Sequence, residues 1–216
     1  IIAATMLQQG EAIPTALGIA LLAGIVGGLF NGILVAYIGI TPFVATLGTL
    51  TLFNGLALRI SGGTTIFGRA IPESIGTFGR GGIELGMLDE QRLLLPNLTI
   101  IAIVALFIVW VVLEQTVFGR RLYAIGGNAE AARLGGIRVR LLTLLAFVLS
   151  GLGASIGGLM LLSRLATANP TQGDGLMLNA IAAVFLGMTM SEEGEPHVLG
   201  TLLGVMILGV LSNGLT

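Results

Sequence analysis

The side chains that usually carry catalysis or bind metals are almost absent from this chain. It has no cysteine, and His197 is its only histidine. The chain therefore has no disulfide, no zinc–thiolate site and no cysteine nucleophile, and a metal site or catalytic triad built on histidine is nearly excluded. All ten basic residues are arginine, so the lysine with which a standard P-loop holds ATP phosphates is missing.

Two binding chemistries that the sequence superficially suggests are also disfavoured. Gly151, Gly153 and Gly157 have the spacing of a dinucleotide-binding loop, but they lie inside the uncharged run 141–163. That run leaves no room for a strand, a turn and an amphipathic helix, so we expect no cofactor bound by this chain. No basic stripe with interleaved aromatic residues is present, and we expect no nucleic-acid partner.

A few polar side chains interrupt the apolar runs. Amides and hydroxyls inside a membrane usually face the interior of a helix bundle, where they find partners. They either line a path for a polar, hydroxyl-rich solute or hydrogen-bond one helix to another, and both interpretations remain open. The candidates for such a path are Asn31, Thr46, Asn54 and Asn179.

The segment 116–140 has the most specific local pattern. Asn128 is a good helix N-cap, and 129–134 are strong helix formers. Glu130 lies in the first turn of this helix and Arg133 near its end, as the helix dipole favours. Gly135 and Gly136 provide the C-terminal stop. We predict a short capped helix here, steadied by docking on a partner because a helix this short is marginal alone.

The elements that position these residues are apolar. Hydrophobic residues make up 55% of the 216 residues and charged residues 10%, whereas a soluble domain is about 25% charged. Lipid rather than water must cover such a surface. We therefore predict an all-α, polytopic transmembrane helix bundle embedded in the lipid bilayer, with about five full spans plus one short or re-entrant segment.

Uncharged runs locate the spans, since about 20 residues cross a bilayer. The break between the first two lies at 39–42, where Gly39 and Pro42 interrupt one long run. The short segment 176–191 is interrupted by glycine and is either a thin span or re-entrant. The full spans are predicted at about 15–38, 42–60, 93–113, 141–163 and 198–216.

Arginine placement predicts the orientation. Five of the ten arginines fall in 116–140, which places this loop in the cytoplasm. The glycine-rich loop 61–92, with a possible hairpin or interfacial helix, is then external, as is the turn 165–175. We slightly favour a re-entrant 176–191, which would place the acidic turn 192–195 outside.

Glycines recur at a spacing of four within three spans. Residues at this spacing share one helix face, and small side chains there let helix backbones approach closely. Close packing is favoured over a moving pathway as their role. The glycines are Gly24, Gly28 and Gly32, then Gly153 and Gly157, then Gly200 and Gly204.

Several motifs in matching order resemble the permease subunits of bacterial ABC sugar importers, of the ribose, xylose and galactoside group. The family pattern F-G-R-x-x-Y-A-I-G-G-N-x-x-A-A-R-L-S-G-I is matched at 118–137, with Gly135 where serine is usual. The resemblance covers nearly the whole chain. Further matches lie at 31–37, 42–49, 163–165, 170–171, 179–184 and 208–215.

This resemblance implies a function without catalysis in this chain. Residues 1–216 would be one transmembrane permease domain of the bacterial inner membrane, and 116–140 its cytoplasmic coupling loop. A separate ATPase subunit would carry ATP and Mg, a periplasmic binding protein would deliver the solute, and a second permease subunit would complete the pathway. We expect Glu130, Ala131, Ala132 and Arg133 at the ATPase contact, and Gly126, Gly127 and Gly136 to set the loop's shape. The full coupling set is Gly119, Arg120, Tyr123, Gly126, Gly127, Asn128, Glu130, Ala131, Ala132, Arg133, Leu134 and Gly136.

The chain departs from the family in two ways. The sequence 188–197 replaces a glycine-rich turn, and the more N-terminal helices of the family are absent, so we expect a fragment of a longer chain. A permease of a branched-chain amino-acid ABC importer and an ATP-independent secondary transporter remain as alternatives. The latter usually has buried ionisable groups for ion coupling, and none is clear here.

Overall fold

Long apolar helices dominate the computed structural model, which describes residues 1–68, 71–88, 91–190 and 194–214. Among these residues, four helices are long and apolar enough to cross a membrane. They are α2 (Ile13–Ile33), extended by a π-helical turn at Leu34–Ile38, α3 (Pro42–Ser61), α5 (Asn97–Trp110), extended by a π-helical turn at Val111–Gln115, and α8 (Val139–Leu165). The protein is therefore a multi-pass, all-α membrane protein, as its composition predicts.

Proline and glycine set the limits of these helices. Gly39 has φ +86° and Pro42 is the first residue of α3, so the predicted break between the first two spans is confirmed. The third span begins later than predicted, at Asn97 instead of residue 93, because Pro96 closes a strand and supplies the N-cap of α5. Proline cannot donate a backbone hydrogen bond and suits a helix start.

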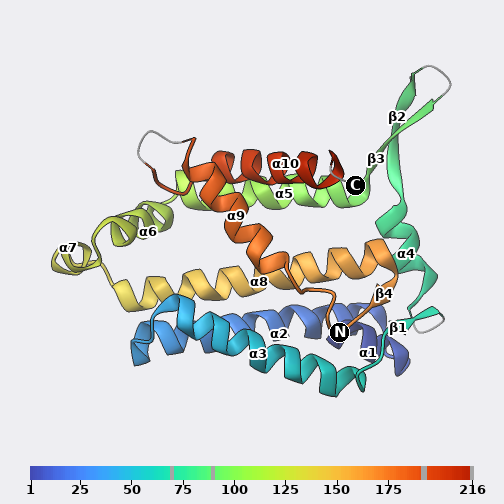
Figure 1. Ribbon diagram of the computed structural model, residues 1–216, viewed down its shortest axis with the longest axis horizontal. Coiled ribbons are helices and arrows are strands. Elements are labelled where there is room, and N and C mark those ends of the chain that lie inside the picture. The colour runs from blue at the N-terminus through green and yellow to red at the C-terminus, as the bar shows by residue number, and fades with distance from the viewer. Residues whose placement is uncertain (69–70, 89–90, 191–193, 215–216) are drawn as a thin grey trace.

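Shorter helices complete the bundle (Figure 1). α1 (Ile2–Gln8) packs beside α2, while α10 (Val198–Gly214) lies alongside α5, and α9 (Leu176–Met188) crosses obliquely in front of the bundle. α9 has 13 residues and is about 20 Å long, which is less than the ~30 Å hydrocarbon core of a bilayer.

Glycines bring α2 and α8 into backbone contact. A Cβ added to Gly24 or Gly28 would collide with the backbone of α8 at Gly151 or Phe147, respectively, and one on Gly32 would press on Leu144. Thus the prediction of close packing is confirmed for the α2 glycines, which meet an antiparallel α8.

On α8, the glycine that contacts another helix is not one of the two predicted glycines. A Cβ on Gly153 or Gly157 would meet nothing within 4 Å, whereas one on Gly151 would overlap the Gly24 carbonyl group. The spacing Gly153–Gly157 marks a face of α8, but that face is not covered in this chain. α9 and α10 pack as predicted, because a Cβ on Gly200 or Gly204 would collide with α9 at Gly187 or Ala183.

The bundle has two different ends. One end carries α6 (Val117–Gly127) and α7 (Ala129–Leu134), and we call it the α7 end (Figure 1). The other, the α4 end, carries α4 (Glu73–Arg80) and two small antiparallel pairs. These pairs are β1 (Ile66–Phe67) with β4 (Thr167–Ala168), and β2 (Gly82–Leu88) with β3 (Gln91–Pro96). Segment 61–92 thus contains the short helix α4 and the first strand of the hairpin, while the second strand continues to Pro96.

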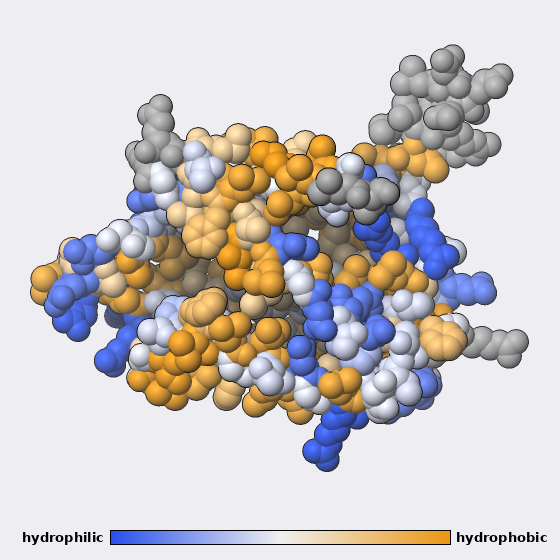
Figure 2. Space-filling view, in the orientation of Figure 1, coloured by the Kyte–Doolittle hydropathy of each residue, from blue (hydrophilic) through white to orange (hydrophobic). Residues whose placement is uncertain are grey.

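The best-buried core of the chain lies at the α4 end. α1, the start of α2, α4 and the end of α8 meet there in a cluster of nine buried apolar residues. Elsewhere the spans expose large apolar side chains such as Phe43, Phe107 and Val210. Figure 2 shows this apolar surface over α5, α10 and α3. Such a surface is stable against lipid or another apolar subunit.

The segment from 169 to 188 runs between the two ends, which contradicts our preference for a re-entrant 176–191. β4 holds its start at the α4 end, and α9 finishes at the α7 end (Figure 1). Glu195, in the turn that follows, lies near enough to Tyr123 of α6 to raise its pKa. Length explains the error, because α9 alone is too short and the preceding non-helical residues make up the distance. Glu192 and Glu193 of the acidic turn lie outside the described residues.

Candidate functional site

The N-terminus of α7 is capped by a side chain. The Asn128 Oδ1 atom accepts hydrogen bonds from the Glu130 and Ala131 backbone N–H groups, at 3.0 and 2.9 Å. These donors have no partner inside the helix, so the amide side chain satisfies two groups that a short helix would otherwise leave to water. The predicted N-cap is confirmed.

The C-terminus of α7 is closed by a Schellman motif. The Ile137 N–H donates to the Ala132 carbonyl and the Gly136 N–H to the Arg133 carbonyl, both at 3.0 Å. Gly136 has φ +82°, a conformation that other residues adopt only with strain. Gly135 has an ordinary backbone conformation, so Gly136 is the residue that ends the helix.

α7 projects from the end of the bundle and presents a mixed surface. Glu130 and Arg133 form an exposed ion pair, with 3.6 Å between Oε1 and Nη2, and Leu134 is 81% exposed. Ala131 is exposed, but Ala132 is only 7% exposed and faces the rest of the chain. Of the four residues expected at a partner contact, Ala132 is therefore the one that is not accessible.

α6 is a complete helix, whereas the sequence predicts a polar loop at these residues. Thr116 is its N-cap and accepts from the Gly119 N–H at 3.4 Å. A Cβ on Gly119 would overlap the Leu113 carbonyl group, so glycine is required for α6 to fold back on the end of α5. The available signal was Thr116, a residue type that favours the N-cap position.

Gly126 and Gly127 do not set the shape of this loop within the chain. Both belong to the last turn of α6, neither has a positive φ, and a Cβ on either would meet nothing within 4 Å. The backbone of this chain therefore does not require glycine at either position, whereas Gly136 has a positive φ. Arg120 is exposed on α6.

Tyr123 is a partly buried residue of α6 at the α7 end. Burial raises the pKa of its phenol above the ordinary value, and the negative charges of Glu114 and Glu195 act in the same direction. These carboxylates come from the end of α5 and the turn before α10. The phenol of Tyr123 therefore stays protonated near neutral pH.

The candidate pathway residues do not form one site. The Thr49 Oγ1 donates to Asn31 Oδ1 at 2.7 Å and links α3 to α2, with Thr49 only 5% exposed. The Thr46 hydroxyl donates within its own helix, to the Pro42 and Phe43 carbonyls. Asn31 thus serves helix pairing, the plainer of the two interpretations.

Asn54 and Asn179 lie apart from that pair. Asn54 is half-buried further along α3, and Asn179 is exposed on α9, a different element. Within the described ranges no three His, Asp or Glu side chains are grouped so that they could hold a metal ion.

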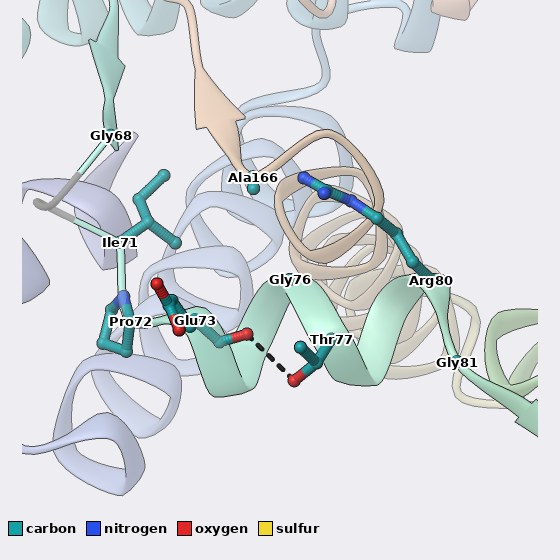
Figure 3. Close-up of a pocket in the computed structure, with 9 residues that line it drawn as sticks. All are labelled: Gly68, Ile71, Pro72, Glu73, Gly76, Thr77, Arg80, Gly81 and Ala166. Atoms are coloured by element: carbon teal, nitrogen blue, oxygen red, sulfur yellow. Dashed lines mark hydrogen bonds between the residues drawn. The ribbon is translucent and has the colours of Figure 1, made fainter.

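A pocket of about 870 Å³ opens beside α4 at the opposite end (Figure 3). Glu73 and Arg80 stand at the two ends of α4, and the Thr77 hydroxyl between them donates to the Glu73 carbonyl at 2.9 Å. Ala166, at the end of α8, has φ +51°, which is uncommon for a residue other than glycine. The remaining lining residues are Gly68, Ile71, Pro72, Gly76 and Gly81.

Comparison with known proteins gives consistent matches along the chain. The family model described as "Branched-chain amino acid transport system / permease component" matches residues 1–216. The ribose import permease protein RbsC of Bacillus subtilis is 43% identical over 185 residues, covering 86% of this chain. The galactose/methyl galactoside import permease protein MglC of Salmonella typhimurium is 36% identical and covers 100% of it, and RbsC of Escherichia coli is 36% identical and covers 93%.

The chain spans 55% of the length of the Bacillus protein, 67% of the Salmonella protein and 60% of the Escherichia protein. No solved structure matches it.

Proposed function

Because this chain belongs to the branched-chain amino acid transport system permease component family, we propose that it forms the membrane pathway of an ATP-driven importer. Its cargo would be a sugar or a sugar-like solute. The relatives that match it are import permeases named for ribose and for galactose or methyl galactoside, which favours a sugar over an amino acid.

The observation that carries the proposal is the form of α7. A six-residue helix is too short to be stable by itself, yet this one is capped at both ends by specific hydrogen bonds. It presents Ala131, Arg133 and Leu134 outward from the end of the bundle. A rigid, exposed helix with one large apolar side chain suits a groove on a partner protein.

We assign the partners by the two ends of the bundle. An ATPase subunit, holding ATP and Mg, would bind α7 on the cytoplasmic side of the inner membrane. A binding protein would deliver the solute at the α4 end, where Glu73 and Arg80 flank the pocket. A second permease subunit would cover part of the exposed apolar surface of the spans.

The decisive experiment uses the absence of cysteine in this chain. Ala131→Cys in the full-length protein, in inverted membrane vesicles, should crosslink to an ATPase subunit, and ATP should alter the yield. Ala132→Cys is the matched control, since it is the next residue but is 7% exposed. It should crosslink much more weakly.

Other outcomes discriminate between the remaining functions. A thiol at position 131 that reacts only from the periplasmic side would reverse the proposed orientation. A cytoplasmic thiol that captures no ATPase, together with uptake insensitive to ATP, would favour a secondary transporter. Uptake of labelled leucine, with none of ribose or galactose, would assign an amino-acid cargo.

A further inference from the structure

The residues between β4 and α9 are polar although they lie within the length of the bundle. Residues 169–175, which we call the polar segment, read Asn-Pro-Thr-Gln-Gly-Asp-Gly and contain no large apolar side chain. The sequence alone predicts an external turn for these residues. In the structure they start at the α4 end and lead inward, and α9 begins about midway along the direction of α8 (Figure 1).

Because α9 is short, the polar segment must lie within the depth of the membrane. Its 13 residues cover about 20 Å of a hydrocarbon core about 30 Å thick, and α9 ends at the α7 end. The missing length must be supplied by the polar segment. Non-helical backbone at membrane depth is tolerated only where protein buries it or where it lines a water-filled cavity.

The hydrogen bonds inside the polar segment leave part of it unsatisfied. The Asn169 N–H donates to Gln172 Oε1 at 3.0 Å, and the Thr171 N–H and hydroxyl both donate to Asn169 Oδ1 at 2.9 Å. The Gln172 Nε2 atom is buried without a hydrogen-bond partner. Asp174, in contrast, is exposed. A buried amide and a carboxylate at this depth are costly unless water or a polar ligand meets them.

Asn179 extends this polar surface onto α9. It lies one turn before Ala183 on the same helix face, and Ala183 is buried where α9 packs on Gly204 of α10. Asn179 itself is exposed, so the two helices no longer cover this face at its position. Figure 2 shows a hydrophilic patch over this part of the molecule, between the apolar surfaces of α10 and α3.

We infer that the polar segment and Asn179 form a hydrogen-bonding section of the solute path, which receives the hydroxyl groups of a sugar. Gln172 and Asn179 offer amide donors and acceptors, and Asp174 offers a carboxylate acceptor for hydroxyl protons. This inference rests on the proposed function, because it assigns residues to the path of the same importer.

Thiol accessibility tests the inference in the full-length protein within its complete importer. Asp174→Cys and Asn179→Cys should react with a water-soluble, membrane-impermeant thiol reagent, and ribose or galactose with the binding protein should slow the reaction. Leu178→Cys is the matched control, because it is the neighbour of Asn179 and 66% exposed but apolar. It should react at least about tenfold more slowly, since a thiol in lipid does not ionise.

Transport provides the second measurement. Asn179→Leu should lower sugar uptake by about tenfold through the loss of its hydrogen bonds, and Asn179→Gln should restore part of it. ATP hydrolysis by the assembled complex should persist in both variants, which shows that they fold and assemble.

The results separate the two proposals. The inference is overturned if Asp174→Cys and Asn179→Cys are as slow as Leu178→Cys, or if Asn179→Leu transports normally. If the unmodified protein takes up neither sugar while the thiols react as expected, the proposed cargo is wrong and the water-accessible segment stands.

Discussion

The cap of α7 offers the sharpest test of how the helix is held in place. Asn128→Ala removes the side chain that accepts from the Glu130 and Ala131 N–H groups at 3.0 and 2.9 Å. Loss of such a cap costs about 1 kcal/mol, which changes the ratio of formed to frayed helix about fivefold. No longer helix can absorb this loss, because α7 has six residues.

Two assays measure that change in the reconstituted importer. Hydrogen exchange at the Ala132 and Gly135 amides, which donate to the Asn128 and Ala131 carbonyls, should become about fivefold faster, in proportion to the frayed population. Solute uptake driven by ATP should fall in the same variant, because a frayed α7 would no longer fit the ATPase subunit that we propose as its partner. Asn128→Asp is the control, since aspartate caps as well as asparagine.

Exchange and transport by Asn128→Ala at the rates of the unmodified protein would refute this role of the cap. Impairment of Asn128→Asp to the level of Asn128→Ala would also refute it, because the asparagine would then act through direct contact with a partner instead of through the cap. Unchanged exchange with lost uptake would lead to the same conclusion.

Three further predictions concern packing and backbone conformation. Gly28→Ala should destabilise the protein by about 1–3 kcal/mol, because its Cβ collides with the Phe147 carbonyl. Thermal unfolding in detergent measures this loss. Gly153→Ala is the control and should show no loss, because its Cβ meets open space. Gly136→Ala should cost about 1–2 kcal/mol of α7 stability, with faster amide exchange in that helix, while Gly126→Ala changes neither quantity. Thr49→Val should cost about 1 kcal/mol through loss of the hydroxyl bond to α2, and equal unfolding temperatures for Thr49→Val and the unmodified protein would contradict it.

The long spans could be predicted because an uncharged run is a direct measure of membrane depth. The observed helices Ile13–Ile38, Pro42–Ser61 and Val139–Leu165 lie within a few residues of the predicted limits. α9 could not be placed in this way, because its crossing depends on the non-helical residues before it. Hydropathy detects the length of an apolar run. It does not detect polar, non-helical residues that lie within the depth of the membrane.

The local chemistry of α7 could also be predicted, since caps depend on neighbours in sequence. Asn128 and Gly136 act as their residue types indicate. Tertiary contacts could not be read in the same way. Ala132 is buried although it lies on a short helix that projects from the bundle, and Gly151 rather than Gly153 meets α2. A helical glycine pattern identifies a face but does not identify which face finds a partner.

One helix, α8, spans the distance between the two ends of this bundle. Its N-terminus follows directly from the loop after α7, while Ser163, near its C-terminus, donates a hydrogen bond of 2.7 Å to the Ile75 carbonyl of α4. The 27 residues of α8 make a rod about 40 Å long. A tilt of about 10° around its centre would move each end by about 3.5 Å, in opposite directions. Because glycine contacts pack α2 closely against α8, the two helices would tilt together as a rigid pair. A movement at the α7 end would then be transmitted to the α4 end.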